Sequence, residues 1–212
     1  MTDSFLLTCL SERSELVSFR FRQPSGAIAI MRSVHLRYLE DASPVLFDYA
    51  SNALASQKPA GLPSTLLPGF DAFQSWLYTG GYSNKVTTND TGPSLHLSFH
   101  ALIFGVLFDI GHFQALAIHH LDRLLASTAS RYANSPIRLT PSLVLNVLGM
   151  LRGLEDRWVP KSIVDEAITE LEDALGGIMV KVVRDHGFYD PTVSWRSVWV
   201  QYPRLKEIVS CT

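Results

Sequence analysis

A long apolar stretch at residues 95–110 sets the strongest limit on how this chain folds. No residue from Leu95 to Phe108 carries a formal charge, and the first carboxylate follows at Asp109. A helix that is hydrophobic on nearly every face is stable only inside a core, whereas a membrane span needs about 20 apolar residues in a row. We therefore expect a buried core helix here, and no membrane as a partner.

A second segment, residues 69–81, has the spacing of a short amphipathic helix. Its large apolar residues fall on one face: Phe70, Phe73, Trp76 and Leu77. Gly80 and Gly81 follow, and glycine readily takes the left-handed backbone conformation that ends many helices. Because such a stripe is most often part of a core, we expect a helix that packs inward and ends at the two glycines.

The first part of the chain predicts a β-hairpin. Residues 17–21 alternate apolar with polar side chains, residues 23–26 have the composition of a turn, and residues 27–30 resume with β-branched side chains. This arrangement is typical of two antiparallel strands joined by a short connection.

Two helices and a third strand are expected after the hairpin. Ser33 is a typical helix cap, so a helix is predicted from there through about Leu39, and Pro44 suits the first position of the next. A short strand is expected near Leu66. This order of elements requires a small sheet capped by helices, so the predicted fold class is α/β (α+β) and mostly helical.

The last third of the chain is expected to form a helical extension. Residues 128–138 have the composition of a linker, so we place a boundary there and expect a first domain at 1–128 and an extension packed on it at 139–212. Thr140 and Pro141 predict the start of the extension's first helix.

The second helix of the extension is expected over residues 160–175, with two chemically different faces. Its apolar stripe is predicted to point inward: Ile163, Ala167, Ile168 and Leu171. Its acidic stripe is predicted to face solvent: Asp165, Glu166, Glu170, Glu172 and Asp173. Gly176 and Gly177 are expected to end or kink this helix.

Charge and cysteine content narrow the class of partner. The formal net charge is −2 at pH 7, 18% of the residues are charged, and no Lys/Arg cluster lies on a predicted helix. Nucleic acids and anionic membranes are bound through such clusters, so we expect neither as a partner. Cys9 and Cys211 lie near opposite ends and give no disulfide framework, which favours a cytoplasmic or nuclear location.

Three segments in order resemble the BTB/POZ domain family, in particular its divergent fungal members. Trp76-Leu77-Tyr78-Thr79-Gly80 is similar to the family's Trp-Leu-Tyr-Thr-Gly helix end. Residues 34–39 and 43–46 are similar to its Val-His and Ser-Pro segments, and residues 106–116 are similar to a segment with a central aspartate. The resemblance covers about residues 15–127, and the C-terminal third resembles the helical extension of many fungal members. The residues that carry it are Val34, His35, Ser43, Pro44, Trp76, Leu77, Tyr78, Gly80 and Asp109.

The resemblance implies a non-catalytic protein–protein interaction domain. Family members associate with copies of themselves or with the cullin scaffold of a ubiquitin ligase. Contacts between two copies are then expected in the leading segment and first helix, at Phe5, Leu6, Leu10, Leu36 and Leu39. Members that bind cullins well tend to carry an acidic motif after their second helix, and residues 50–70 contain no acid. A homodimer is therefore the favoured assembly, with a cullin adaptor as the alternative.

The histidines offer an alternative of a different class. Five of them occur between residues 96 and 120: His96, His100, His112, His119 and His120. The first two are four residues apart, a spacing that can hold zinc on a helix. No glutamate lies between them as a general base, and no nucleophile or phosphate-binding motif is present. We therefore expect no enzyme and no cofactor, with a histidine-based metal enzyme as the alternative.

Two titratable residues of the resembling segments are expected to be structural. His35 is predicted to bond to a backbone carbonyl. Asp109 follows a strongly apolar helix, so it is predicted to be a buried carboxylate that caps or bridges backbone groups.

Overall fold

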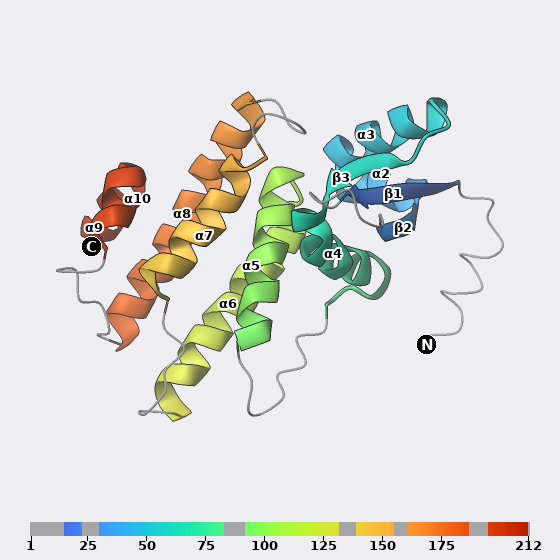
Figure 1. Ribbon diagram of the computed structural model, residues 1–212. Coiled ribbons are helices and arrows are strands. Elements are labelled where there is room, and N and C mark those ends of the chain that lie inside the picture. Colours follow the sequence, from blue (N-terminus) through green and yellow to red (C-terminus); the bar gives the residue numbers. More distant parts are fainter. Residues whose placement is uncertain are drawn as a thin grey trace. The chain divides into compact units, whose positions relative to one another are not determined.

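The computed structural model describes residues 15–22, 30–82, 92–131, 139–154, 161–186 and 195–211. The chain divides into two compact units, Met1–Leu67 and Pro68–Thr212, which we call unit 1 and unit 2 and describe separately. Figure 1 shows mostly helices and one small sheet of three strands. The predicted mostly helical α+β class is therefore confirmed.

Unit 1 is built on a hairpin with a third strand beside it. The first strand lies where it is predicted, the second begins at Ile30, the last residue of the predicted 27–30, and residues 27–29 lie outside the described residues. β1 (Leu16–Arg22) pairs antiparallel with β2 (Ile30–His35) and parallel with β3 (Ala60–Pro63), so the sheet order is β2-β1-β3. Val17, Phe19 and Phe21 on β1 are buried, and the residues between them are more exposed. This period of two is what a strand with one covered face requires.

Two helices connect β2 to β3. α2 (Leu36–Ala42) is followed by α3 (Pro44–Ala55), and the buried Ser43 hydroxyl caps α3 by accepting a hydrogen bond from the Leu46 N–H at 3.1 Å. The prediction that a helix starts at Ser33 is wrong, because Ser33 lies within β2, where its hydroxyl bonds to that of Ser18. Cross-strand pairing outweighs the local capping preference of serine at this position.

The third strand lies a few residues earlier than expected. The residues near Leu66 form a 3₁₀ turn, η1 (Ser64–Leu66), and the strand itself is Ala60–Pro63. The Tyr49 hydroxyl on α3 donates a hydrogen bond to the Gly61 carbonyl of this strand. Pro63 has no N–H to offer another strand.

Unit 2 begins with three helices that share an aromatic core. They are α4 (Leu67–Thr79), α5 (Gly92–Leu107) and α6 (Gly111–Arg131). The predicted end of α4 is confirmed, since Gly80 has a φ of 75°. Residues 101–108 are all buried, as expected for a helix hydrophobic all round. Over the described residues, no helix combines the length and apolarity that a membrane crossing requires.

Four further helices complete unit 2: α7 (Pro141–Arg152), α8 (Lys161–His186), α9 (Arg196–Gln201) and α10 (Pro203–Ser210). Thr140 caps α7 as predicted, with its hydroxyl accepting from the Leu143 N–H at 3.2 Å. α8 contacts α5 and α6 as well as α7 and α10. The helices expected as an extension packed on the first domain contact α5 and α6 within unit 2, and the two compact units meet at Leu67.

Two side chains of α8, Ile163 and Glu172, do not face as predicted, and of the outcomes left open at its two glycines the helix does not end there. The helix continues through Gly176 and Gly177 to His186. A Cβ added at Gly176 would lie 2.6 Å from Cγ2 of Ile208, so this glycine is explained by the close approach of α10. Ile163 is 38% exposed, and Val164 occupies the inward position instead.

Candidate interaction surface

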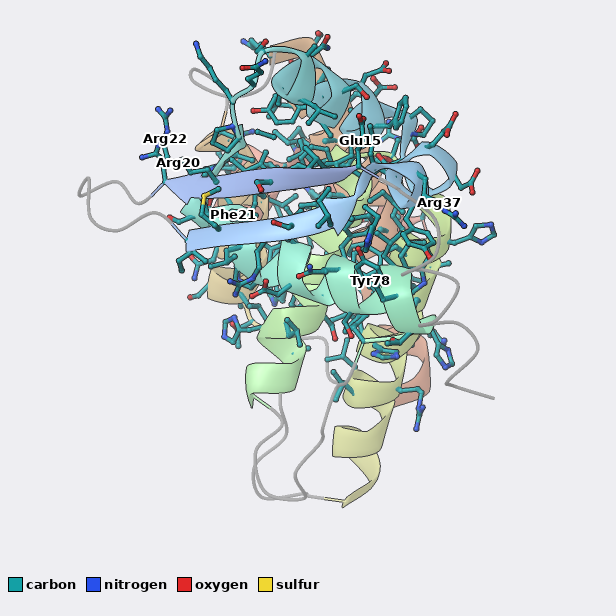
Figure 2. All side chains as sticks on the ribbon, turned by 90° about the vertical axis from the view of Figure 1, so that its right-hand side faces the viewer. Glu15, Arg20, Phe21, Arg22, Arg37 and Tyr78 are labelled. Atoms are coloured by element: carbon teal, nitrogen blue, oxygen red, sulfur yellow. The ribbon has the colours of Figure 1, made fainter. Side chains whose placement is uncertain are left out.

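The outer face of the β1–β2 hairpin combines exposed apolar and basic side chains. Leu16 and Met31 are 57% and 47% exposed, and Arg20 and Arg22 on β1 are exposed as well. Because Arg20 pairs with Met31 across the two strands, these side chains share one face. Figure 2 shows Arg20 and Arg22 together near one end of β1, with Glu15 at the other. We call Leu16, Arg20, Arg22 and Met31 the outer hairpin face.

Two of the four side chains of the outer hairpin face are basic. Arg20 and Arg22 are exposed near one end of β1, and Glu15 lies beside Leu16 at the other (Figure 2). Basic clusters are expected above only on helices, so Arg20 and Arg22 are not predicted as part of one. The signal for them is the alternation of arginine with phenylalanine in residues 19–22, which puts these two arginines on the face opposite to the buried rings.

Helix α3 presents two more exposed apolar side chains, one turn apart. Val45 is 43% exposed and Tyr49 is 37% exposed. Partial burial raises the pKa of the Tyr49 hydroxyl, and its hydrogen bond to Gly61 and the charge of Arg22 offset part of that effect. Tyr49 is therefore a neutral hydrogen-bond donor at neutral pH.

The predicted contacts between copies are only partly available. Phe5, Leu6 and Leu10 lie outside the described residues. Leu36 is half-buried, whereas Leu39 is 0% exposed and packs in the core of the chain. Leu39 is therefore not available to a second copy. Leu39 is the buried residue of α2.

The signature residues of unit 1 hold the junction between β2 and the helices. Val34 and Ser43 are fully buried, and Pro44 occupies the first turn of α3. His35 precedes α2, and its ring contacts that of Tyr38 edge-on, with centroids 5.8 Å apart. Val34 is therefore a core residue, and Ser43 with Pro44 sets the start of α3.

The signature residues of α4 lie at the edge of the aromatic core of unit 2. Trp76, Leu77 and Tyr78 are half-buried, and the Trp76 ring lies 5.5 Å from that of Phe113 on α6. Gly80 ends the helix in the left-handed conformation. Trp76 therefore packs α4 against α6 within unit 2.

The expectation that Asp109 is buried is wrong. Asp109 is exposed and follows the end of α5 with a φ of 50°. The Ile110 N–H donates to the Gly105 carbonyl at 2.8 Å and the Asp109 N–H to the Val106 carbonyl at 3.3 Å. This pair of bonds is the Schellman ending of a helix, in which the residue with positive φ is usually glycine. Asp109 therefore supplies a turn conformation, with its side chain in solvent.

We expect Asp109→Gly to raise the free energy of unfolding by about 0.5–1 kcal/mol, because glycine adopts a positive φ without steric cost. Urea unfolding followed by circular dichroism measures the change. Asp109→Asn is the matched control, since it removes the charge that raises the pKa of Glu170 but keeps the side chain. A glycine variant less stable than the asparagine variant would contradict this account.

Two pairs of histidines interact, one pair on α5 and one on α6. His96 is exposed and His100 is half-buried, and burial together with the charge of His96 lowers the pKa of His100. Burial, His119 and Arg123 lower the pKa of His120, whose ring lies 4.8 Å from that of Tyr82. Within the described ranges, no three His, Cys, Asp or Glu side chains come close enough to hold a metal ion.

The burial of Tyr82 beside these histidines raises the pKa of its hydroxyl to about 12, although the Ser98 hydroxyl acts in the opposite direction. Tyr82 is 5% exposed and its ring also contacts Phe113. It is therefore a neutral core residue that joins α5 and α6.

Comparison of the chain with protein-family models, with curated proteins and with solved structures gives no match.

Proposed function

We propose that this chain is a non-catalytic protein–protein interaction module of the BTB/POZ kind, which associates with copies of itself through unit 1. The observation that carries the proposal is the outer hairpin face, where Leu16 and Met31 are 57% and 47% exposed. Fully burying a Leu or Met side chain contributes about 1.5–3 kcal/mol. A second surface placed on this face would gain part of that amount.

The distribution of exposed apolar side chains supports unit 1 as the contact region. Six large ones are exposed among the described residues: Leu16, Met31, Val45, Tyr49, Ile163 and Val200. Four of these six belong to unit 1, the smaller of the two units. Methionine, tyrosine and arginine are also residue types enriched in protein interfaces. The composition of the face is thus that of a contact surface with a basic rim.

The order of elements gives further support. Two strands, two helices, a third strand and then α4 follow one another, which is the order that the sequence patterns predict for a small sheet capped by helices. A location in the cytoplasm or nucleus accords with two cysteines at distant positions in the sequence.

We expect the purified chain to be a dimer in size-exclusion chromatography with light scattering, and Leu16→Thr/Met31→Thr to weaken it about 10-fold or more. Threonine keeps the strand propensity and removes the exposed apolar surface. The matched control is Val200→Thr, at a site that is 74% exposed on α9 of unit 2. This control should leave the dimer unchanged.

Three results would argue against this proposal. A wild-type chain that stays monomeric at high concentration would end the proposal of self-association. If the double variant forms dimers as readily as the wild type, the contact between copies does not involve the outer hairpin face. If the chain co-elutes with the amino-terminal domain of a cullin, a ligase adaptor becomes the better description.

A further inference from the structure

Helices α9 and α10 cover part of α7 and α8 at the end of unit 2. α10 packs along α8, and α9 contacts α7 and α10. The approach of α10 is close enough that a side chain at Gly176 would collide with Ile208. Val198, Tyr202 and Leu205 are buried, with exposures of 0%, 2% and 0%. Detaching the two helices would therefore uncover an apolar surface.

Glu172 is a buried carboxylate at this contact. It lies on α8 and is only 6% exposed, although the sequence predicted that it would face solvent. It interacts electrostatically with Arg152 on α7, Arg204 on α10 and Tyr202, which lies between α9 and α10. Ionising a carboxyl in so largely buried a position is costly.

The arginine of α10 is bonded to a different carboxylate. The Arg204 Nη2 lies 2.9 Å from Oδ1 and 2.8 Å from Oδ2 of Asp173, and its Nε lies 3.1 Å from Oδ1. This bidentate pair has the favoured geometry for an arginine and a carboxylate. Arg204 therefore attracts Glu172 only at longer range.

The arginine of α7 is also bonded elsewhere. The Arg152 Nη2 donates to the Gln201 carbonyl at 3.5 Å, and its guanidinium lies 4.6 Å from the centre of the Tyr202 ring. Both arginines near Glu172 thus hold the α9–α10 segment to α7 and α8. Neither of them hydrogen-bonds Glu172, whose charge is left in a largely covered position.

We propose that α9 and α10 form a proton-controlled strap, in which α10 docks more firmly on α8 when Glu172 is protonated and loosens when Glu172 ionises. The inference stands on the geometry of unit 2 and is independent of the proposed self-association.

The direction of the effect follows from the environment of Glu172. The pKa of this carboxyl is raised, and burial is the largest cause of the shift. Asp173 also raises the pKa, whereas Arg204 and Arg152 lower it. The docked state therefore binds the proton more readily than the released state. Docking is firmest at low pH and weakens as the pH rises from the usual value of 4.5 through the raised one.

The other titratable groups around this contact do not account for the same change. Burial raises the pKa of Tyr202, so it stays neutral throughout this range. Glu207 and Asp173 both face Arg204, which keeps its charge. The pKa of Glu170 is also raised, mainly by burial. The other groups that shift it are Asp109, Gln114, Glu166 and Asp173, none of which belongs to α9 or α10. Glu170 is therefore the control residue on the same helix.

Hydrogen exchange of the α10 amides tests the strap in the full chain. We expect their protection, relative to that of α5 amides in the same sample, to fall as the pH rises from about 4.5 through the raised pKa of Glu172. The fall should be about tenfold for each unit by which docking raises the pKa of Glu172. Dividing the exchange rates of the α10 amides by those of the α5 amides removes the intrinsic pH dependence of exchange.

Substitutions assign the effect to one carboxyl. Glu172→Gln removes the charge at constant shape, and Glu172→Met provides a second, apolar replacement of similar size. Both are expected to keep α10 protected over the whole range, whereas Glu170→Gln should retain the wild-type pH dependence. The proposal is overturned if wild-type protection does not change with pH, if both Glu172 variants remain pH-dependent, or if Glu170→Gln abolishes the dependence.

Discussion

Replacing Phe73 with alanine is expected to lower the free energy of unfolding by about 3–5 kcal/mol, the usual cost of truncating a buried phenylalanine. Phe73 is 0% exposed, and its ring centre lies between 5.4 and 6.2 Å from those of Phe70, Trp76, Phe104 and Phe113. These rings come from α4, α5 and α6. The cavity cannot close by a shift of one helix, because that helix would lose its contacts with another.

Urea unfolding of the variant and the wild type, followed by circular dichroism, measures this loss. Leu77→Ala, one turn later on α4 and half-buried, should cost about 1–1.5 kcal/mol. If the two units unfold in separate transitions, the loss belongs to that of unit 2. Equal losses for the two variants would show that Phe73 is not at the centre of the core.

Alanine in place of Gly69 is expected to cost about 3 kcal/mol, near the upper end for an overpacked core. A Cβ at Gly69 would lie 2.4 Å from the backbone oxygen of His100 and 2.7 Å from Cβ of Phe104. Neither atom belongs to the flexible end of a side chain. α4 and α5 would therefore have to move apart, and the contact of Phe70 with Phe104, at 5.7 Å between ring centres, would loosen.

Gly149→Ala is the matched control for this variant. Gly149 lies inside α7, and a Cβ added there would meet nothing within 4 Å. The same substitution should therefore stabilise the protein by up to about 1 kcal/mol through helix propensity alone. Thermal or urea unfolding of both variants should give changes of opposite sign. A neutral Gly69→Ala would mean that α4 and α5 are less closely packed than described.

Features governed by local chemistry were predictable from the sequence. Ser43 with Pro44, and Thr140 with Pro141, mark helix starts where the structure has them, and Gly80 ends α4. In each case the cap or turn depends on the backbone within a few residues. The core position of residues 101–108 followed from the absence of charge.

Features that depend on distant residues were not predictable. The sequence pattern puts Glu172 on a solvent-facing acidic stripe, but in the structure it is buried where α10 packs on α8. The sequence pattern predicts a helix end or kink at Gly176, but the structure explains this glycine by the close approach of Ile208. Ser33 has the sequence context of a helix cap, but in the structure its hydroxyl bonds to that of Ser18 on the neighbouring strand. Of the candidate surface, Leu16 and Met31 could have been found by extending the hairpin alternation by one residue at each strand.

The way β3 ends the sheet bears on how many chains can join one assembly. Its Gly61 carbonyl is already taken by the Tyr49 hydroxyl, and Pro63 has no N–H to donate. A sheet with one edge blocked in this way cannot accept new strands on both sides. Any association that used strand pairing would stop at a closed pair of sheets, and this limits growth toward fibres as the concentration of the chain rises.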